Sequence, residues 1–532
     1  MGSTTAPSPA AQETREPSQR RVWFTPVTAS VLSGLLVFLS MPPVDLGWSA
    51  FVALVPLLWA WRGSGARRAA GYGFLAGCVY FALLLSWVFF FGPFAVVPLV
   101  AALAAMWALI GAAVAGLARL DVRSPWTTAA VWVLVEAFMG RIPLGGFSWG
   151  EVGYAFHGVG VVRSLASWGG VLVISFVVVA VNALLLDIGV ALSRRRAVPQ
   201  GAGAGRSLLR AGVGIGIVAL VTVGLHVAVF EPTPTGEMSF ALVQANDINR
   251  DLTDAELNAR YLPRRHLAEA ADLEGVSEDD VDLIVIPESG LDWDPRIDPG
   301  YPNDDLGALD DEIADVATTH DAAVLANASV EVGNDELENT NFLYDPDGTL
   351  QGTYVKQHLV PFGEYVPGRR YLDWIGALDQ VPRDNVAGDE VGEFQVAGHT
   401  VGSVICFESA FGATYRETVE AGAEIVVVQT NNRSYRRSSN SEQHIAMSQM
   451  RAVETGRAVL HASVSGSSAV IAADGTIEAT TPQFETTVLA GTSTTMTGET
   501  PYLRFGDWIL LASVLTLLGA VGHGLFARRA RP

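Results

Sequence analysis

The chain has 532 residues, of which 50% are apolar, and combines a mean hydropathy of +0.31 with a formal net charge of −21. This length predicts at least two folded units, and the apolar excess is confined to residues 24–230 and 507–527. Nearly all of the acid lies between them, in 231–500, which predicts a solvated acidic surface. Such a surface excludes the basic footprint that a nucleic-acid partner requires.

Eight apolar stretches predict membrane-spanning helices, each of which needs about 20 mostly apolar residues. Two of them, 48–61 and 125–140, are short or interrupted. The residues before position 22 are polar, and the first apolar run lacks a small-residue cleavage site, so we expect an uncleaved anchor rather than a signal peptide. The expected spans are 24–41, 48–61, 71–92, 94–118, 125–140, 169–192, 208–230 and 507–527.

The placement of arginine predicts how these spans are oriented, because cytoplasmic loops carry an excess of basic residues. Arginines occur in both tails and in every second loop between the spans, whereas the remaining short loops hold only Arg141 and Arg163. Eight spans therefore predict cytoplasmic termini and an extracytoplasmic acidic segment. The expected domains are a polar cytoplasmic tail (1–22), a seven-span membrane domain (23–232), a catalytic domain (233–500), and an eighth span with a basic cytoplasmic tail (501–532).

Two polar features interrupt the apolar part of the chain. Glu136 lies inside the fifth expected span, where a carboxylate is costly and is expected to face a partner or a cavity. The connection 143–154 on the outer side is rich in glycine and aromatic residues, including Phe147 and Trp149. It is either an interfacial aromatic belt or part of a substrate site.

From residue 236 the pattern changes to short strands that alternate with helical segments and hairpins. This alternation predicts a layered α/β sandwich with mixed sheets. The expected strands are 238–243, 282–286, 322–326, 352–355, 402–405 and 425–429. The expected helices lie near 253–273, 308–319 and 441–456, and the expected hairpin turns are 345–348 and 474–475.

Three reactive side chains directly follow expected strands: Glu288, Lys356 and Cys406. Strand ends at one edge of a sheet are where α/β sites assemble. A helix is expected to begin at Cys406, and helix N-termini favour the thiolate. Lys356 is the only lysine among the 34 lysines and arginines, and codon bias explains the arginines without explaining why one lysine remains. Lysine offers a compact, titratable ammonium that arginine does not reproduce.

These three residue types together suit acyl transfer. A carboxylate takes the thiol proton as general base, and an ammonium stabilises the oxyanion of a tetrahedral intermediate. A Cys–His arrangement would have to use one of three histidines, none of which lies at a comparable strand end: His358, His444 and His461. The two cysteines lie in different contexts and are expected to stay unpaired. No His/Cys cluster has ligand spacing, so we expect neither a metal nor another cofactor.

The residues around these positions resemble the nitrilase, or carbon–nitrogen hydrolase, superfamily. The run 354–367, which contains Lys356 and Glu364, is similar almost residue by residue to the membrane branch of that superfamily, the apolipoprotein N-acyltransferases. The apolar part agrees, because 41–58 resembles the first hairpin of that family and 136–154 resembles its outer-loop motif. The segment 443–457 resembles the helix after the nucleophile strand, so the resemblance covers nearly the whole chain.

The resemblance implies a bundle of about eight spans that carries an extracytoplasmic α-β-β-α nitrilase-like domain in the cell (cytoplasmic) membrane. It implies ping-pong transfer of a fatty acyl group from a phospholipid to the α-amine of the diacylglyceryl-modified N-terminal cysteine of apolipoproteins. Cys406 would be the nucleophile that carries a thioester, Glu288 the general base and Lys356 the oxyanion stabiliser. Glu364 would orient the lysine and Glu408 would shape the pocket, with Phe407 as a further supporting residue. We expect the protein to act as a monomer.

The chain also departs from the family pattern. The segment 431–438, which contains Arg433, Tyr435 and Arg436, replaces the small and aromatic residues common in the family. It is either a mobile lid that contacts lipid head groups or a surface loop. The family's tryptophan after the first soluble strand has no counterpart in 246–254, and the later glycine motif ending at Gly466 lacks the common asparagine. These departures concern substrate preference.

Two other functions remain alternatives. One is a membrane-tethered amidase that releases its acyl group to water. The other is a receptor or scaffold with a degenerate nitrilase-like domain, against which the intact Glu288, Lys356 and Cys406 set argues.

Overall fold

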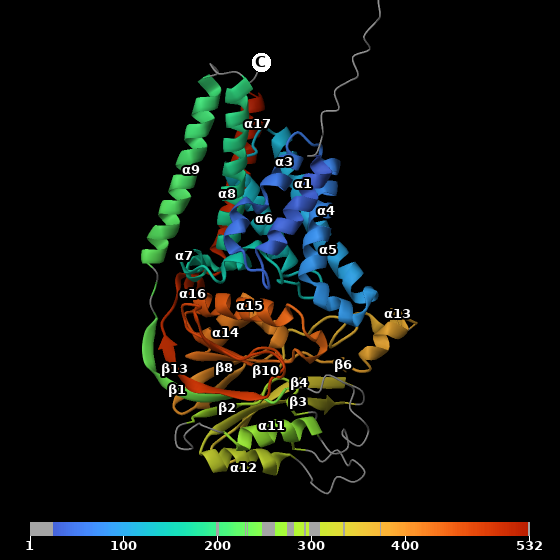
Figure 1. Cartoon of the computed structure of the whole chain (residues 1–532), viewed down its shortest axis with the longest axis vertical. Helices are drawn as coiled ribbons and strands as arrows, with labels where there is room; N and C mark the ends of the chain where they lie inside the picture. The colour runs from blue at the N-terminus through green and yellow to red at the C-terminus, as the bar shows by residue number, and fades with distance from the viewer. Residues whose placement is uncertain are drawn as a thin grey trace, which may run out of the picture.

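The computed structural model describes residues 25–197, 202–228, 230, 232–246, 261–273, 281–291, 294–296, 309–333, 336–372 and 374–529. Figure 1 shows a bundle of helices (residues 26–227 and 508–529, the helical bundle) standing on a layered α/β domain, with α17 returning into the bundle near the C-terminus. The predicted polar tail 1–22 lies outside the described residues.

Each of the eight predicted apolar stretches contains a helix. Within the described residues, four are long and apolar enough to cross a membrane: Pro93–Arg119 (α5), Ala166–Arg196 in α8, Gly203–Val227 in α9 and Trp508–Arg529 (α17). The other stretches form α1 (Pro26–Leu39), α2 and α3 (Ala50–Ala53 and Val55–Trp61), α4 (Ala66–Leu84) and α6 (Pro125–Met139). Proline begins α1, α5 and α6, where its missing N–H is not needed by the helix.

Two of these predicted helices differ from their expected form. The predicted 71–92 helix ends at Leu84, and the short 3-10 helix η2 (Ser86–Phe91) follows it. Helix α8 runs to Ala197 but breaks at Gly169 and Gly170, and Gly170 has a φ of 73° that favours glycine. The break leaves the Val171 N–H without a partner in its own helix, and the Glu454 carboxylate accepts it at 2.9 Å.

The α/β domain contains two facing sheets. The first has the order β13-β1-β2-β3-β4-β5, with β6 paired to β4, and the second has the order β12-β11-β10-β9-β8-β7. All six predicted strands are present. The strands are β1 (Thr233–Gln244), β2 (Leu283–Val285), β3 (Ala323–Val332), β4 (Glu336–Tyr344), β5 (Leu350–Val355), β6 (Asp384–Asn385), β7 (Glu393–Val396), β8 (His399–Ile405), β9 (Ile425–Thr430), β10 (Ala458–Ser463), β11 (Ala469–Ile471), β12 (Ile477–Thr480) and β13 (Thr487–Thr497).

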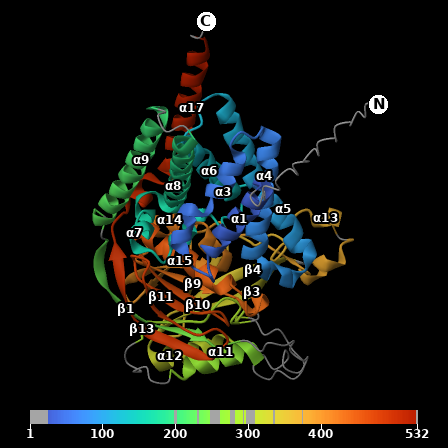
Figure 2. The same ribbon diagram turned by 45° about the horizontal axis from the view of Figure 1, so that its top comes forward.

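Helices cover the outer faces of both sheets, which gives the implied α-β-β-α order (Figures 1 and 2). Helices α11 (Tyr261–Ala271) and α12 (Asp310–His320) pack on the first sheet, away from the helical bundle. Helices α14 (Gly412–Glu420) and α15 (Asn440–Thr455) pack on the second sheet, and α15 lies next to the bundle. The first part of the predicted 253–273 helix, up to 260, lies outside the described residues.

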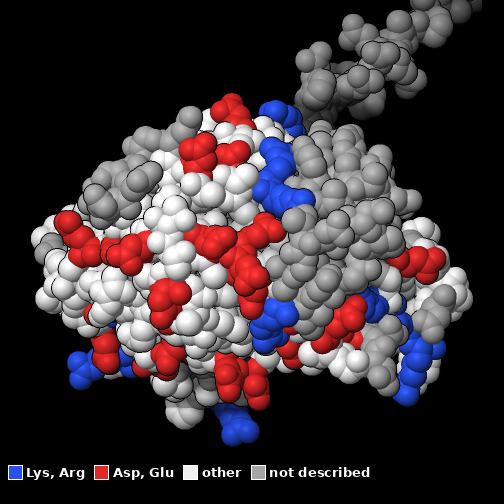
Figure 3. Space-filling view, turned by 90° about the horizontal axis from the view of Figure 1, so that it is seen from below, with Lys and Arg blue, Asp and Glu red and all other residues white. Residues whose placement is uncertain are grey.

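The face of the α/β domain remote from the bundle carries the predicted acidic surface. Figure 3, seen from that side, shows Asp and Glu side chains over much of the described surface and fewer Lys and Arg side chains.

The helical bundle and the α/β domain share one hydrophobic core. Phe407 and Phe411, at and beyond the 3-10 helix η5 (Cys406–Ala410), belong to the same apolar cluster as the bundle helices, and so do Met447 and Met450 of α15. The Gln443 side-chain oxygen accepts hydrogen bonds from two bundle indoles, Trp87 at 3.1 Å and Trp149 at 2.8 Å. The two parts are therefore fixed to each other by α15.

A buried ion pair adds to this junction. The Arg451 guanidinium pairs with Glu454 on α15 and also donates to the Tyr154 hydroxyl at 2.5 Å. The two charged side chains are 4% and 2% exposed. Breaking such a pair from one side leaves a buried, uncompensated charge, which costs about 3–5 kcal/mol.

We therefore expect Glu454→Ala to lower the melting temperature of the detergent-solubilised protein by several degrees, measured by intrinsic fluorescence. The matched control is Glu420→Ala, because the Glu420 carboxylate lies 3.7 Å from Arg416 and is 61% exposed. A surface pair of this kind contributes about 0–1 kcal/mol. Equal shifts in the two variants would contradict the structural role of the Arg451–Glu454 pair.

Candidate active site

The three residues predicted at strand ends meet in one buried cluster. Lys356 Nζ lies 3.1 Å from Glu288 Oε1, and the lysine side chain is 1% exposed. The Glu288 carboxylate lies close enough to the Cys406 thiol for its charge to raise the thiol pKa, and the Thr430 hydroxyl lies 3.4 Å from the sulfur. Glu288 and Lys356 follow strands of the first sheet, whereas Cys406 follows β8 of the second. The site thus lies between two facing sheets. The expectation that all three residues lie at the edge of one sheet is wrong, because the packing of the two sheets brings residues from both of them together.

Lys356 is held between two carboxylates. Its Nζ lies 2.9 Å from Glu364 Oε1, in addition to Glu288. Burial by itself lowers the pKa of Lys356, but the charges of Glu288 and Glu364 outweigh it and raise the pKa well above the ordinary value. The ammonium therefore stays charged inside the protein, as an oxyanion stabiliser requires.

Asn339, on β4, was not singled out in the sequence and completes this arrangement. Its side-chain N–H₂ group donates to Glu288 Oε1 at 2.9 Å and to Glu364 Oε1 at 3.1 Å. Asn327 in turn donates to the Asn339 oxygen at 2.8 Å. The sequence signal that could have identified Asn339 is its spacing from Asn341 in β4. Polar residues two positions apart in a buried strand lie on the same face of the sheet.

Cys406 sits at a strained turn, with φ of 49°, at the start of η5. Burial is the main cause that raises the pKa of its thiol to about 12, and the Glu288 charge adds to it, whereas Lys356 and the Thr430 hydroxyl act in the opposite direction. The expected thiolate at a helix N-terminus is therefore wrong. The element is a five-residue 3-10 helix, too short for a strong dipole, and desolvation dominates. The resting thiol is protonated and lies beside a carboxylate that can accept its proton.

Glu408 is completely buried and fixes the chain around the site. One carboxylate oxygen accepts the backbone N–H groups of Gln357 at 2.7 Å and His358 at 3.1 Å, and the other accepts Ile405 N–H at 2.8 Å. The Tyr354 hydroxyl lies 2.9 Å from both oxygens. Glu408 therefore ties the segment after Lys356 to the strand that presents Cys406.

The predicted aromatic residues line the bundle side of the site. Phe407 contacts Phe147 of the 143–154 connection, here called the outer connection, with ring centroids 5.8 Å apart. The rings of Phe147 and Trp149 stack with centroids 6.4 Å apart. Tyr435 of the 431–438 segment packs edge-on against Trp87 at 4.9 Å and Phe91 at 5.6 Å. The backbone N–H of Asn431 in that segment donates to Glu288 Oε2 at 2.8 Å. The outer connection and the 431–438 segment thus meet at the same site.

The histidines do not replace Glu288 as a base. His444 Nε2 lies 3.0 Å from the Cys406 backbone oxygen, and burial lowers the pKa of His444 to about 4. His358 stacks on Phe411, with ring centroids 4.5 Å apart, and His461 hydrogen-bonds to Ser448. Among the described residues, no three His, Cys, Asp or Glu side chains are grouped to hold a metal ion.

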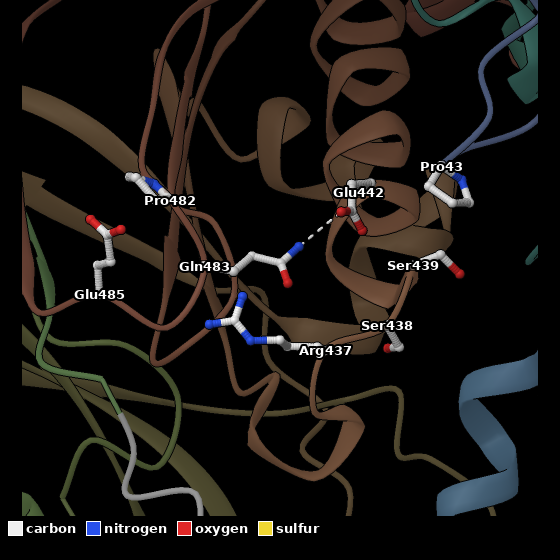
Figure 4. Close-up of a pocket in the computed structure, with 8 residues that line it drawn as sticks. All are labelled: Pro43, Arg437, Ser438, Ser439, Glu442, Pro482, Gln483 and Glu485. Atoms are coloured by element: carbon white, nitrogen blue, oxygen red, sulfur yellow. Dashed lines mark hydrogen bonds between the residues drawn. The ribbon is translucent and has the colours of Figure 1, made fainter.

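One cavity adjoins this site. It measures about 280 Å³ and lies against Phe407, Phe411, Leu359 and His358, and residues 144–145 also line it. A larger cavity of about 520 Å³ includes Arg437 and Ser438 of the 431–438 segment in its lining (Figure 4). Its lining combines two prolines with charged and polar residues: Pro43, Arg437, Ser438, Ser439, Glu442, Pro482, Gln483 and Glu485. Only the smaller cavity is lined by a neighbour of Cys406.

Family models match both parts of the chain. The model of the apolipoprotein N-acyltransferase N-terminal domain matches residues 33–184, and the carbon–nitrogen hydrolase model matches residues 241–502. The apolipoprotein N-acyltransferase of Gloeobacter violaceus is 30% identical over 98% of this chain and 99% of its own. That of Geobacter metallireducens is 30% identical over 91% and 92%. An amidase structure from Nesterenkonia sp. AN1 is 17% identical, with a TM-score of 0.37, over 52% of this chain and 99% of its own.

The charges around Cys406 predict opposite effects of two substitutions on its thiol. Glu288→Gln removes a negative charge that raises the thiol pKa, so alkylation by iodoacetamide at pH 8 should become faster. Lys356→Met removes a positive charge that lowers the thiol pKa, so alkylation should become slower. The measurement is the pH profile of alkylation, with Cys406→Ala as the control for labelling elsewhere. Profiles that move in the same direction would contradict this electrostatic arrangement.

Proposed function

The chain belongs to the apolipoprotein N-acyltransferase family, and we propose that it transfers a fatty acyl group from a membrane phospholipid to the α-amine of the diacylglyceryl-modified N-terminal cysteine of apolipoproteins. The observation that carries this proposal is the charged Lys356 held between Glu288 and Glu364, beside a thiol at the junction with the helical bundle. A buried cation next to a nucleophile stabilises the negative charge that develops during acyl transfer. The apolar bundle supplies contact with the lipid.

In the first half-reaction, Glu288 takes the thiol proton and Cys406 attacks the carbonyl carbon of the phospholipid ester. Lys356 stabilises the oxyanion of the tetrahedral intermediate. The carbon–oxygen bond of the ester then breaks, and the proton held by Glu288 passes to the leaving lysophospholipid hydroxyl. The acyl group remains on Cys406 as a thioester. The adjacency of the thiol to Glu288, and its raised pKa, support a base that acts at the moment of attack.

In the second half-reaction, the free α-amine of the lipidated cysteine attacks the thioester carbonyl. Glu288 accepts a proton from the amine as the carbon–nitrogen bond forms. The carbon–sulfur bond then breaks, and the proton passes from Glu288 to the sulfur, which regenerates the thiol and the carboxylate and leaves the amide product. The buried surroundings of Cys406, which is 8% exposed, limit competing attack by water. Asn339 and Glu364 act by positioning Glu288 and Lys356.

We assign the substrates to surfaces around this site. The cavity of about 280 Å³ beside Phe407 and Phe411 receives the part of the acyl chain nearest the thioester. Leu144 and Gly145 of the 143–154 connection line this cavity, and Phe147 of the same connection contacts Phe407, so the connection serves as part of the substrate site as well as an aromatic belt. The protein is proposed to act as a monomer with no metal or other cofactor.

We also propose a topology for the chain. Eight spans would place both termini in the cytoplasm and the 233–500 catalytic domain on the outer side of the cell membrane, with 23–232 as the seven-span domain and 501–532 as the last span and tail. The alternation of arginine-rich and arginine-poor loops supports this arrangement. The four long apolar helices and the shorter apolar helices of the bundle are compatible with this topology.

The amidase alternative differs in the acceptor, because water instead of an amine would take the acyl group. A soluble substrate would not require the core that η5 and α15 share with the bundle, so the acyltransferase assignment accounts for more of the structure. A receptor or scaffold would not require a buried Lys356 with two carboxylate partners.

The acyl-enzyme provides the direct test. Purified protein incubated with phospholipid labelled in its acyl chain should retain label that hydroxylamine removes, and Cys406→Ala should retain none. Addition of a diacylglyceryl peptide should then transfer the label into an amide product, detected by mass spectrometry. Free fatty acid without amide would make the protein a hydrolase, and label that persists in Cys406→Ala would refute the mechanism.

Labelling of intact cells tests the topology. In a background that retains Cys78 and has Cys406→Ala, Glu390→Cys should react with a membrane-impermeant maleimide added outside, whereas Arg195→Cys should react only after lysis. Glu390 and Arg195 are both exposed, so accessibility differs only by the side of the membrane. Reaction of Arg195→Cys in intact cells would refute the proposed orientation.

A further inference from the structure

The segment 431–438, here called the arginine loop, carries three arginines between the candidate active site and the bundle: Arg433, Arg436 and Arg437. It includes the 3-10 turn η6 (Arg433–Tyr435) and begins at Asn431, whose N–H donates to Glu288. Tyr435 anchors it between the rings of Trp87 and Phe91 in η2. The loop is therefore packed against both parts of the protein.

Arg436 lies where the bundle meets the lipid surface in the proposed topology. Its guanidinium carbon is 5.3 Å from the centre of the Phe90 ring. Phe90 is 46% exposed, and Phe94, in the first turn of the long apolar helix α5, is 68% exposed. Within the described part of the chain the Arg436 guanidinium forms no ion pair or hydrogen bond, so its donors remain available to a ligand.

The backbone of Arg436 adopts a strained conformation. Its φ of 49° and ψ of −154° lie in a region that only glycine occupies readily. Glycine at this position would adopt the turn without strain. A strained non-glycine residue that extends its side chain beside a reaction site indicates that the side chain has a use.

The neighbouring charges separate Arg436 from Arg437. Arg437 lines the larger cavity with Glu442 and Glu485, and its guanidinium lies 4.9 Å from the centre of the Phe484 ring (Figure 4). Two carboxylates in the same cavity oppose its charge. Arg436 faces the exposed ring of Phe90 instead, and in the proposed topology its charge would lie at the level of lipid head groups.

We propose that Arg436 binds the phosphate of an anionic phospholipid head group, so that the preferred acyl donor carries a net negative charge, as phosphatidylglycerol does. This inference rests on the proposed function. Arginine binds phosphate oxygens through a fork of N–H donors. A zwitterionic head group offers the same phosphate, but its ammonium would be repelled by the arginine loop. The donor ester then lies next to Cys406, because Asn431 of the same loop contacts Glu288.

The test compares two donors with identical acyl chains, phosphatidylglycerol and phosphatidylethanolamine, in neutral detergent micelles with the full-length protein. The readout is the ratio of kcat/KM for thioester formation from the two donors. Wild type should favour phosphatidylglycerol, and Arg436→Gly should reduce the ratio about fivefold, corresponding to ~1 kcal/mol for one arginine near a lipid surface. Arg436→Lys should keep most of the preference. The preference should also shrink as salt is raised.

Arg504→Gln is the matched control, because Arg504 is likewise exposed and its guanidinium carbon lies 5.7 Å from the centre of the Phe505 ring, on helix α16 (Pro501–Phe505). Its donor ratio should equal that of wild type. The melting temperature of Arg436→Gly should stay equal or rise, since glycine relieves the turn, so a lost preference would not reflect unfolding.

Each other outcome overturns a defined claim. Thioester formation at equal rates from both donors in wild type would overturn the inference and leave the proposed function intact. Absence of a thioester from every phospholipid would overturn the proposed function itself. Inhibition by inorganic phosphate in wild type but not in Arg436→Gly, without a donor preference, would assign the arginine to free phosphate and also overturn the inference.

Discussion

The whole site depends on one buried cation. An ammonium taken out of water costs several kcal/mol unless partners surround it, and Lys356 is almost fully buried. Its two carboxylate partners come from separate parts of the chain, because Glu288 follows β2 and Glu364 belongs to the segment after Lys356 itself. Asn339 in β4 donates to both carboxylates and so holds them in place. The strand register that brings these groups together is therefore constrained by charge as well as by the core. The same cation lowers the pKa of the buried thiol, and in the proposed reaction it would offset negative charge on both the sulfur and the oxyanion.

The helical bundle is part of the site and not only its anchor. Phe407, next to Cys406, packs in the core that the bundle helices form. The Gln443 side chain on α15 accepts hydrogen bonds from the indoles of Trp87 and Trp149 in the bundle. Because protein interiors are closely packed, a shift of the bundle would be transmitted to the turn that presents Cys406.

The thiol and the arginine loop both show local strain beside the reaction site. Cys406 and Arg436 each adopt a positive φ that ordinary residues avoid. At Cys406 the turn places the sulfur near Glu288, and at Arg436 it directs a cation toward the exposed ring of Phe90 in η2. Strain of this kind persists only where the surrounding structure holds it, and here the surrounding structure is the packed junction of sandwich and bundle.

The sequence alone determined the apolar helices, the six expected strands, and the three residues Glu288, Lys356 and Cys406, because periodicity and composition are local properties that survive without tertiary context. It did not determine that these residues come from two facing sheets, nor that Asn339 joins the carboxylates, because contacts between distant strands depend on packing. The protonation of the thiol was also decided by the tertiary structure. A helix start was expected to favour the thiolate at Cys406, but burial in the shared core removes water from the sulfur and keeps its proton in place.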